Sequence, residues 1–289
     1  MSARFGPAGN SDSFSVSHKS TVEAPAYLKE IGLDHYEYQC GRGVKVSDAL
    51  AAALRAESGK YGISLSVHAP YFISLSGIEK EKRDKSIDYI LQTCDAANRL
   101  GAERIVIHSG SCAKLSREEA LELAKDTLLR ARREAVQRGF EHIRFCPETM
   151  GKVNQLGDLD EVLELCRLDD SFLPCVDFGH LNARCFGCIK SIEDYDAMLT
   201  KIRDRIGSER LGCFHSHFSK IEFTVPGGEK RHLTFEHNDG FGPDYEPLME
   251  LVARYGLSPV FICESAGTQT EDALAMKQYY QSVKQEVKR

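Results

Sequence analysis

Short apolar runs alternate with amphipathic stretches along most of the chain. Eight runs are rich in apolar side chains and are bounded by turn residues, a pattern typical of strands buried on both faces. These runs cover residues 3–9, 34–40, 64–70, 104–110, 143–149, 173–180, 213–220 and 259–265. Because helical patterns separate the runs, the order along the chain predicts parallel strands joined by helices.

The segments between the runs have the residue spacing of amphipathic helices. In residues 85–100, apolar side chains recur every three or four positions, and Gly101 follows where helices often end. Ser116 and Glu119 have the spacing of a capping box, which predicts a helix from there to about Arg138. Weaker helical patterns cover residues 23–31, 47–59, 159–166, 192–206, 245–255 and 271–287.

Eight strands that alternate with helices favour a closed (β/α)8 barrel, the TIM barrel, because eight units close such a barrel. A doubly wound open sheet is the alternative. The sequence shows no internal repeat, no linker rich in Pro, Gly or Ser, and no shift in composition. We therefore expect a single domain over residues 1–289.

Composition narrows the class of protein further. Of 289 residues, 42% are hydrophobic and 28% are charged, which suits a folded chain with a full core. No apolar run approaches the length of a transmembrane helix, and the N-terminal residues lack the apolar region of a secretory signal. We expect a cytoplasmic protein. The net charge of −6 by itself argues against a nucleic-acid partner, but bound divalent cations would cancel such a charge.

The ten cysteines lie mostly inside apolar runs, as is typical of buried thiols in a reducing compartment. One pair, Cys185 and Cys188, has the CxxC spacing. A structural zinc site would need a second such pair. We therefore expect these two to be ordinary unpaired loop cysteines.

Titratable side chains collect at the ends of the predicted strands. They are His68, His108, Glu148, Asp177, His180, His215, His217 and Glu264. In a TIM barrel the carboxyl ends of the strands meet at one face, so these side chains would converge on one pocket. Unpaired carboxylates packed that closely repel one another. A divalent cation removes this repulsion, and the imidazole and carboxylate donors suit zinc, manganese or iron. The sequence predicts a multinuclear metal site.

Several of these residues belong to short motifs that follow one another in a set order. The segments HAPY (68–71), IHSG, PET, VDFGH and ICES together resemble the endonuclease IV family, zinc-dependent apurinic/apyrimidinic endonucleases among the xylose-isomerase-like barrels. The resemblance implies hydrolysis of duplex DNA 5′ to an abasic sugar during base excision repair, by a monomer. Clustered metals suit this reaction because they generate hydroxide near neutral pH and stabilise both the attacking and the leaving oxygen.

The resemblance also implies roles for individual residues. It implies three zinc ions, with Mn²⁺ or Fe²⁺ as possible substitutes. The first two would share Glu148 and take their other ligands from strand ends: His68 and His108 for the first, and Asp177, His215 and Glu264 for the second. The third would be held by His180 and by two ligands from the loop after the seventh strand. We expect Glu148 and Glu264 to be catalytic as well, by steering the attacking water.

The loop after the seventh strand departs from the family pattern. The family has Asp-x-His there, followed by a glycine-rich turn, and residues 230–242 contain no Asp-x-His. Alignment on the glycines brings Thr234 and Glu236 to the ligand positions, whereas alignment on the Arg-His pair brings Lys230 and His232 there. We expect His232 and Glu236 to be the ligands, in a centre of either two or three metals.

Three further residues are candidates for contact with DNA or metal. Arg42 lies between two glycines in the loop after the second predicted strand, where the family contacts DNA. Tyr71 of the HAPY motif is similar to a family tyrosine that contacts DNA. His217 is an additional imidazole beside His215 and is expected to bind either metal or substrate.

A sugar isomerase or epimerase of the same barrel superfamily is the alternative function. Such enzymes bind one metal with four ligands, which Glu148, Asp177, His215 and Glu264 would supply. An epimerase does not need the two extra imidazoles of His68 and His108, whereas a phosphodiesterase with several zinc ions does. The sequence therefore favours the nuclease.

Overall fold

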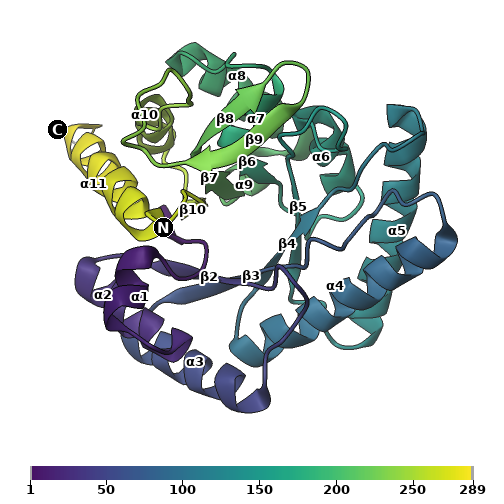
Figure 1. Cartoon of the computed structure of the whole chain (residues 1–289), viewed down its shortest axis with the longest axis horizontal. Coiled ribbons are helices and arrows are strands. Elements are labelled where there is room, and N and C mark those ends of the chain that lie inside the picture. The colour runs from purple at the N-terminus through teal and green to yellow at the C-terminus, as the bar shows by residue number, and fades with distance from the viewer. Residues whose placement is uncertain (1, 288–289) are drawn as a thin grey trace.

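The structure is a computed structural model that describes residues 2–287. Eight parallel strands form a nearly closed barrel with helices around it (Figure 1). The strands are β1 (Arg4–Pro7), β2 (His35–Gln39), β3 (Ser64–His68), β4 (Arg104–His108), β5 (Arg144–Glu148), β6 (Cys175–Asp177), β7 (His215–Phe218) and β10 (Val260–Cys263). Their order in the sheet is β1-β10-β7-β6-β5-β4-β3-β2. The predicted TIM barrel is confirmed, and the doubly wound alternative is wrong.

The barrel closes between β1 and β2, where the pairing is short. A single bridge joins Ala8 to Glu37, and the Gly9 amide donates to the Glu37 carbonyl at 2.9 Å. The two chains approach very closely at Gly6, because a Cβ there would lie 1.9 Å from the carbonyl oxygen of His35. Only glycine permits this approach, and it therefore sets the geometry at the closure of the barrel.

We predict that Gly6→Ala lowers the free energy of unfolding by about 3 kcal/mol or more, because backbone must move to admit the methyl group. Gly59→Ala is the matched control, since a Cβ at Gly59 would meet no atom within 4 Å. Gly59 lies in the helix α3 (Asp48–Tyr61), so its replacement should be neutral or slightly stabilising. Urea denaturation of both variants gives the two values, and equal stabilities would contradict this account of the closure.

The predicted helices are present with small shifts of their ends. They are α2 (Ala24–Ile31), α3, α4 (Lys80–Leu100), α5 (Arg117–Gln137), α6 (Leu159–Cys166), α8 (Ile192–Ile206), α10 (Glu246–Arg254) and α11 (Gln269–Val287). The capping box of α5 is confirmed: the Ser116 amide donates to Glu119 Oε2 at 2.9 Å, and the Glu119 amide donates to Ser116 Oγ at 3.2 Å. Within the described residues, no helix is both long enough and apolar enough to cross a membrane.

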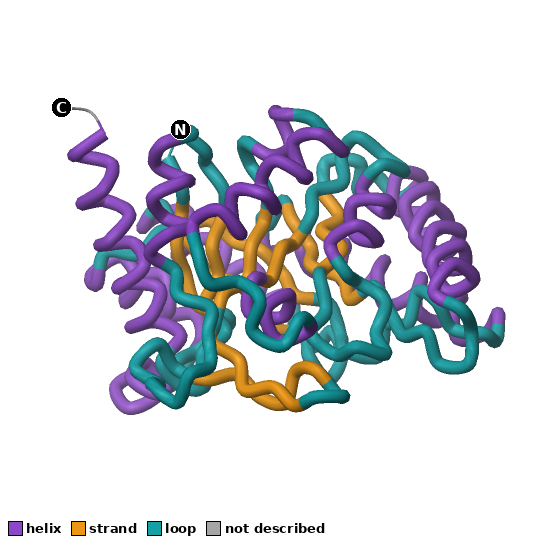
Figure 2. The backbone as a smooth tube through the Cα atoms, turned by 90° about the horizontal axis from the view of Figure 1, so that it is seen from above, coloured by secondary structure: helices purple, strands orange, loops and turns teal. Residues whose placement is uncertain are grey.

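Several elements were not predicted. They are α1 (Asp12–Ser17), a 3-10 helix (Thr21–Glu23), α7 (Phe178–Arg184), α9 (Ser208–Leu211), β8 (Lys220–Thr224) and β9 (Gly228–Leu233). The last two form an antiparallel hairpin that stands apart from the barrel strands (Figure 2). The predicted strand over 173–180 ends at Asp177, because the Asp177 carboxylate accepts from the His180 amide at 2.7 Å and starts α7. His180 therefore lies on a helix rather than on a strand.

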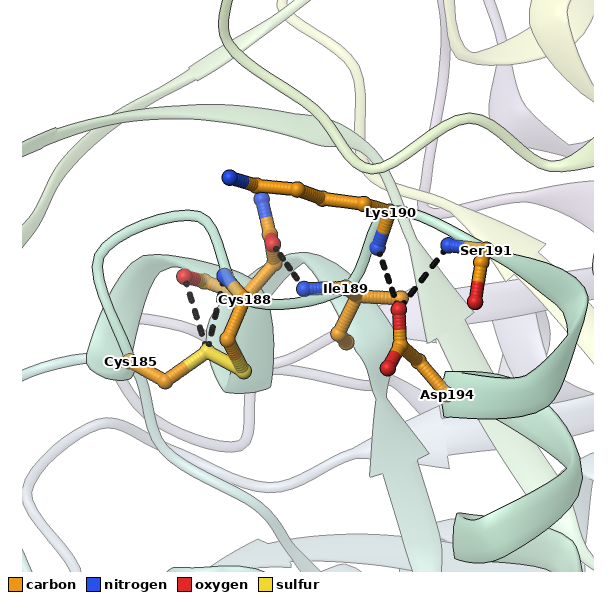
Figure 3. The surroundings of a disulfide bond; sticks show 7 residues. Cys185, Cys188, Ile189, Lys190, Ser191 and Asp194 are labelled. Atoms are coloured by element: carbon orange, nitrogen blue, oxygen red, sulfur yellow. Dashed lines mark hydrogen bonds between the residues drawn. A yellow bond between two sulfur atoms is a disulfide. The ribbon is translucent and has the colours of Figure 1, made fainter.

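Cys185 and Cys188 form a disulfide in the loop that follows α7 (Figure 3). The expectation that this pair is unpaired is wrong, whereas the remaining cysteines are free and nearly all buried, as predicted. The Ile189 amide donates to Asn182 Oδ1 at 3.0 Å, and two further amides donate to Asp194 at the start of α8. These bonds hold the chain between α7 and α8 in one conformation.

Candidate metal centre

A cavity of about 330 Å³ opens at the carboxyl ends of the barrel strands. Titratable side chains from several strands, from α7 and from the hairpin line its wall: His68, His108, Glu148, His180, Glu229, His232 and Glu264. All four histidines and both strand-end glutamates were predicted to belong to this site. The structure brings them together because the carboxyl ends of parallel barrel strands meet at one face.

Glu148 lies at the centre of this cluster and is fully buried at the end of β5. Its Oε2 lies 3.2 Å from His108 Nε2 and 3.4 Å from His68 Nε2. Its Oε1 lies 3.0 Å from Nδ1 of His217 and 3.4 Å from Nδ1 of His180. Burial alone would raise the pKa of Glu148, but the surrounding imidazoles outweigh burial and hold this pKa well below its ordinary value. One ionised carboxylate therefore joins two halves of the cluster.

Hydrogen bonds outside the cavity orient several of these imidazoles. Nδ1 of His68 donates to the carbonyl of the next residue at 2.8 Å, and Nδ1 of His180 donates to the Thr149 carbonyl at 2.9 Å. A carbonyl can only accept, so Nδ1 carries a proton in both rings and Nε2 is the nitrogen that faces the cavity. Nδ1 of His232 lies 2.8 Å from Ser219 Oγ. Such outer partners are typical of histidines that bind metal.

On β7 the structure brings His217, rather than His215, among the carboxylates of the site. In the parallel register of β6 and β7, Asp177 is level with His217, whereas His215 lies two residues earlier along the strand. Nδ1 of His217 lies 3.0 Å from Glu148 and 3.4 Å from Glu264. His217 thus occupies the position for which the sequence predicted His215.

His215 lies one layer deeper in the barrel, where Glu37 bridges the two histidines. Glu37 is fully buried, with Oε2 2.9 Å from His215 Nε2 and Oε1 2.9 Å from His217 Nε2. Ser66 Oγ also donates to Glu37 at 2.7 Å. Burial lowers the pKa of His215 to about 4 despite the opposing effect of Glu37. Burial also acts to lower the pKa of His217, but neighbouring acidic groups raise it well above its ordinary value.

Glu37 was not among the predicted site residues. Its contact with Nε2 of His217 turns Nδ1 toward the cavity, which is the arrangement of a carboxylate that orients a metal-binding histidine. The signal in the sequence is weak: one acidic residue inside the strand segment HYEYQ.

The surroundings of the Asp177 carboxylate indicate that these residues fit a metal ion. Its Oδ1 accepts from the His180 amide, whereas its Oδ2 is buried, lies 3.3 Å from His180 Nδ1 and accepts no hydrogen bond in the described structure. Burial raises the pKa of Asp177 and outweighs the opposing effect of His180, and the nearby glutamates also raise this pKa. Ligand atoms of Glu148, Asp177, His217 and Glu264 all lie within 4.8 Å of one another. A buried carboxylate oxygen without a donor is costly, and a divalent cation satisfies it, so the donor set fits a metal.

A second group of possible ligands joins α7 to the hairpin. It consists of His180, Glu229 and His232, and His180 Nε2 lies 3.5 Å from Glu229 Oε2. In a regular strand, residues three apart face opposite sides. Here β9 has a bulge at Lys230, because the register passes from Glu222–Arg231 directly to Phe223–Glu229. The bulge turns Glu229 and His232 to the same side.

The bulge explains why Glu229 was not predicted. The sequence indicated His232 together with Glu236, but Glu236 is exposed beyond the end of β9 and belongs to none of the ligand groups found among the described residues. Glu229 takes the place that was expected for Glu236. Because one residue bulges out of β9, the Glu-x-x-His spacing places both side chains on the same side of the strand. In a regular strand, an Asp-x-His spacing gives the same arrangement.

Of the two predicted DNA contacts, Tyr71 lines the cavity and Arg42 is exposed in the loop after β2. Tyr71 is 58% exposed, and its ring centroid lies 5.3 Å from that of His108 and 5.6 Å from that of His68. A Cβ at Gly41 would lie 2.7 Å from the Tyr71 ring, so glycine lets the loop pack directly on this ring.

Comparison with known proteins identifies the family to which this chain belongs. Residues 25–282 match the family of xylose isomerase-like TIM barrels, so the chain belongs to that family. A protein of Methanocaldococcus jannaschii, described as uncharacterized, is 32% identical over 279 residues, or 95% of this chain and 96% of that protein. Probable endonuclease 4 of Thermoplasma acidophilum is 28% identical over 180 residues, or 61% of this chain and 60% of that protein. The predicted resemblance to endonuclease IV proteins is confirmed.

Solved structures share the fold with this chain at low sequence identity. Endonuclease IV from Thermus thermophilus has a TM-score of 0.68 at 20% identity and covers 98% of this chain and 99% of its own. A D-tagatose 3-epimerase-like protein has a TM-score of 0.74 at 18% identity and covers 99% and 100%. Because nuclease and epimerase neighbours share the barrel, the choice between them depends on the site residues.

Proposed function

We propose that this protein is a metal-dependent, endonuclease IV-like phosphodiesterase that cleaves DNA 5′ to abasic sites. The observation that carries the proposal is the position of His68 and His108. Both Nε2 atoms lie within 3.4 Å of the Glu148 oxygen that faces away from His217. His68 and His108 thus form a second half of the cluster. A barrel enzyme with one metal does not require these two histidines.

The donor atoms support three metal positions. The proposed ligands for the first position are His68, His108 and Glu148, because both histidines contact the same Glu148 oxygen. The other two positions are ligand groups of the structure: Glu148, Asp177, His217 and Glu264 for the second, and His180, Glu229 and His232 for the third. Nitrogen and oxygen donors of this kind suit zinc, with manganese or iron as substitutes. Bound cations would supply a water of lowered pKa and would stabilise charge on the phosphate in the transition state.

The protein's own residues then bind and orient the reactants. Burial would raise the pKa of Glu264, but His217 outweighs it and lowers this pKa to about 2, so Glu264 is ionised at neutral pH. Its side chain is 15% exposed at the cavity, where it can accept a hydrogen bond from the attacking water. Tyr71 and Arg42 at the rim would contact DNA while the abasic nucleotide is turned out of the helix into the cavity.

The test is nicking of a duplex oligonucleotide that carries one abasic-site analogue, with the undamaged duplex as the control substrate. Protein purified without chelator should cut 5′ to the lesion, and EDTA or His108→Ala should abolish cutting. Absence of cleavage by protein that holds two or more metal ions per chain would overturn the proposal.

A metal-dependent sugar epimerase is the second candidate. The set Glu148, Asp177, His217 and Glu264 could bind a single metal and supply two glutamates as acid and base. The fold is compatible with this function, because an epimerase-like protein has the same barrel. Incubation with ketoses in D₂O, followed by NMR, would show exchange of a carbon-bound proton if this function holds, and we expect no exchange.

The third metal position gives a separate prediction. We expect Glu229→Gln to lower the zinc content by about one ion per chain, since a neutral amide is a much weaker zinc ligand than a carboxylate. Glu236→Gln, the matched control from the same segment, should leave the content unchanged. Elemental analysis after equilibration with buffered zinc measures both. Loss of zinc from the Glu236 variant alone would show that the bulge does not form the site.

A further inference from the structure

A second cavity lies at the opposite end of the barrel from the metal centre. Its volume is about 330 Å³, and the first residues of four strands line it: Arg4 of β1, His35 of β2, Ser64 of β3 and Arg104 of β4. The carboxyl-terminal ends of α3 and α4 complete the wall. This end of a TIM barrel usually serves stability rather than catalysis, and the proposed nuclease activity uses none of these residues.

Three arginines face this cavity without a carboxylate partner. Among the described residues, Arg4, Arg55 and Arg104 form no ion pair with any acidic side chain, although the same chain contains many such pairs. Arg104 is only 9% exposed, and its one hydrogen bond to a described residue is a long one of 3.3 Å to the Phe214 carbonyl. A guanidinium has five donors and keeps its charge in proteins. Most donors of Arg104 are therefore left for a ligand.

A hydroxyl group in the same cavity also lacks a partner. Ser58 is 5% exposed, and its Oγ is buried without a hydrogen bond in the described structure. Oγ of Ser64 differs, since it lies 2.6 Å from His35 Nδ1. A buried hydroxyl without a partner is unfavourable. Because this Oγ has no accessible surface, Ser58 forms part of the wall, and the arginines supply the donors that reach the cavity.

The charges around the cavity favour an anion. Glu103 is the one carboxylate among the residues that line it, against three guanidinium groups. The carboxyl ends of α3 and α4 each add about half a negative charge, which leaves an excess of about one positive charge. Burial lowers the pKa of Arg4, and the charge of Arg104 lowers it further. Glu103 and Asp34 act in the opposite direction on Arg4, but its pKa remains lowered, so the arginines repel one another across the cavity.

We propose that this cavity binds an oxyanion of the phosphate type through Arg104, Arg4 and Arg55. Planar guanidinium groups donate pairs of hydrogen bonds to phosphate oxygens, which makes arginine the preferred residue for this ligand. The cavity lies within the size range of small-molecule sites. The phosphate group can therefore be free phosphate or part of a small phosphate ester.

The test is calorimetric titration of the full chain with inorganic phosphate, after removal of metal with chelator so that the metal centre cannot bind the anion. Arg104→Gln and Arg55→Gln should each weaken binding at least about tenfold through loss of charged hydrogen bonds. Arg55 is exposed, so its replacement leaves the fold intact even if Arg104→Gln unfolds. Arg144→Gln is the matched control: Arg144 pairs with Arg104 in the sheet register and is exposed outside the cavity, so we expect unchanged binding.

Titration with AMP separates the two sources of the phosphate group. Affinity at least about tenfold above that of phosphate would identify a phosphate ester as the ligand, and equal affinity would identify the phosphate group alone. The proposal is overturned if neither compound binds more tightly than about 10 mM. It is also overturned if binding survives in Arg104→Gln and Arg55→Gln, or if Arg144→Gln weakens it equally. Binding that persists in His108→Ala separates this site from the metal centre.

Discussion

Glu148→Gln should reduce cleavage of abasic DNA by about a thousandfold or more and should lower the metal content, because the amide removes the charge shared by two proposed metal positions. The carboxylate lies between His68 and His108 on one side and His217 on the other. Glutamine has nearly the same volume, so the packing around position 148 is retained. The measurements are kcat/KM on an abasic duplex and zinc per chain.

The control for this variant is Glu118→Gln, on the exposed surface of α5. It makes the same chemical change at an exposed residue outside the cavity lining and should leave both quantities unchanged. Wild-type turnover by Glu148→Gln with a full complement of zinc would show that Glu148 is neither a bridging ligand nor catalytic.

His217→Asn should have the next largest effect, a loss of cleavage of about a hundredfold or more, because it removes the imidazole that lies among Glu148, Asp177 and Glu264. His215→Asn is the matched variant two residues away. The His215 side chain faces Glu37 in the layer below, so we expect the His215→Asn protein to keep its zinc. Its thermal midpoint should fall, because a buried hydrogen bond is lost. Zinc content, cleavage rate and thermal midpoint are measured on both proteins.

The two histidine variants separate the structural assignment from the one made on sequence similarity. If His215→Asn loses zinc and cleavage while His217→Asn retains them, then His215 is the ligand and the placement of His217 is overturned. A loss of thermal stability alone in His217→Asn would assign that histidine to the core.

The strands could be predicted because each is a short apolar run bounded by turn residues, and most helices because their apolar residues recur every three or four positions. The Ser116–Glu119 capping box and Gly101 mark helix ends by local chemistry, which does not depend on the rest of the fold. The hairpin β8–β9 could not be predicted in this way, because charged residues occupy both of its faces. His180 was placed on a strand because only the hydrogen bond from its amide to Asp177 reveals the start of α7.

The candidate site could be predicted in outline, since strand ends meet at one face of a barrel whatever the details of the register. The level at which a residue lies along the barrel axis could not be predicted. His215 and His217 both point into the barrel, because residues two apart share a face, and only the pairing with β6 shows which is level with Asp177. Glu229 depends on a bulge and Glu37 on a contact across the barrel interior, and neither leaves a clear signal in the sequence.

A crystal structure of the zinc-loaded protein, with anomalous diffraction measured on both sides of the zinc absorption edge, would show how many zinc ions the site binds. We predict separate zinc peaks beside His68 and His108, beside Asp177 and His217, and beside Glu229 and His232, with Glu148 between the first two. A single peak held by Glu148, Asp177, His217 and Glu264, with free imidazoles at positions 68 and 108, would contradict the multinuclear centre and favour an epimerase.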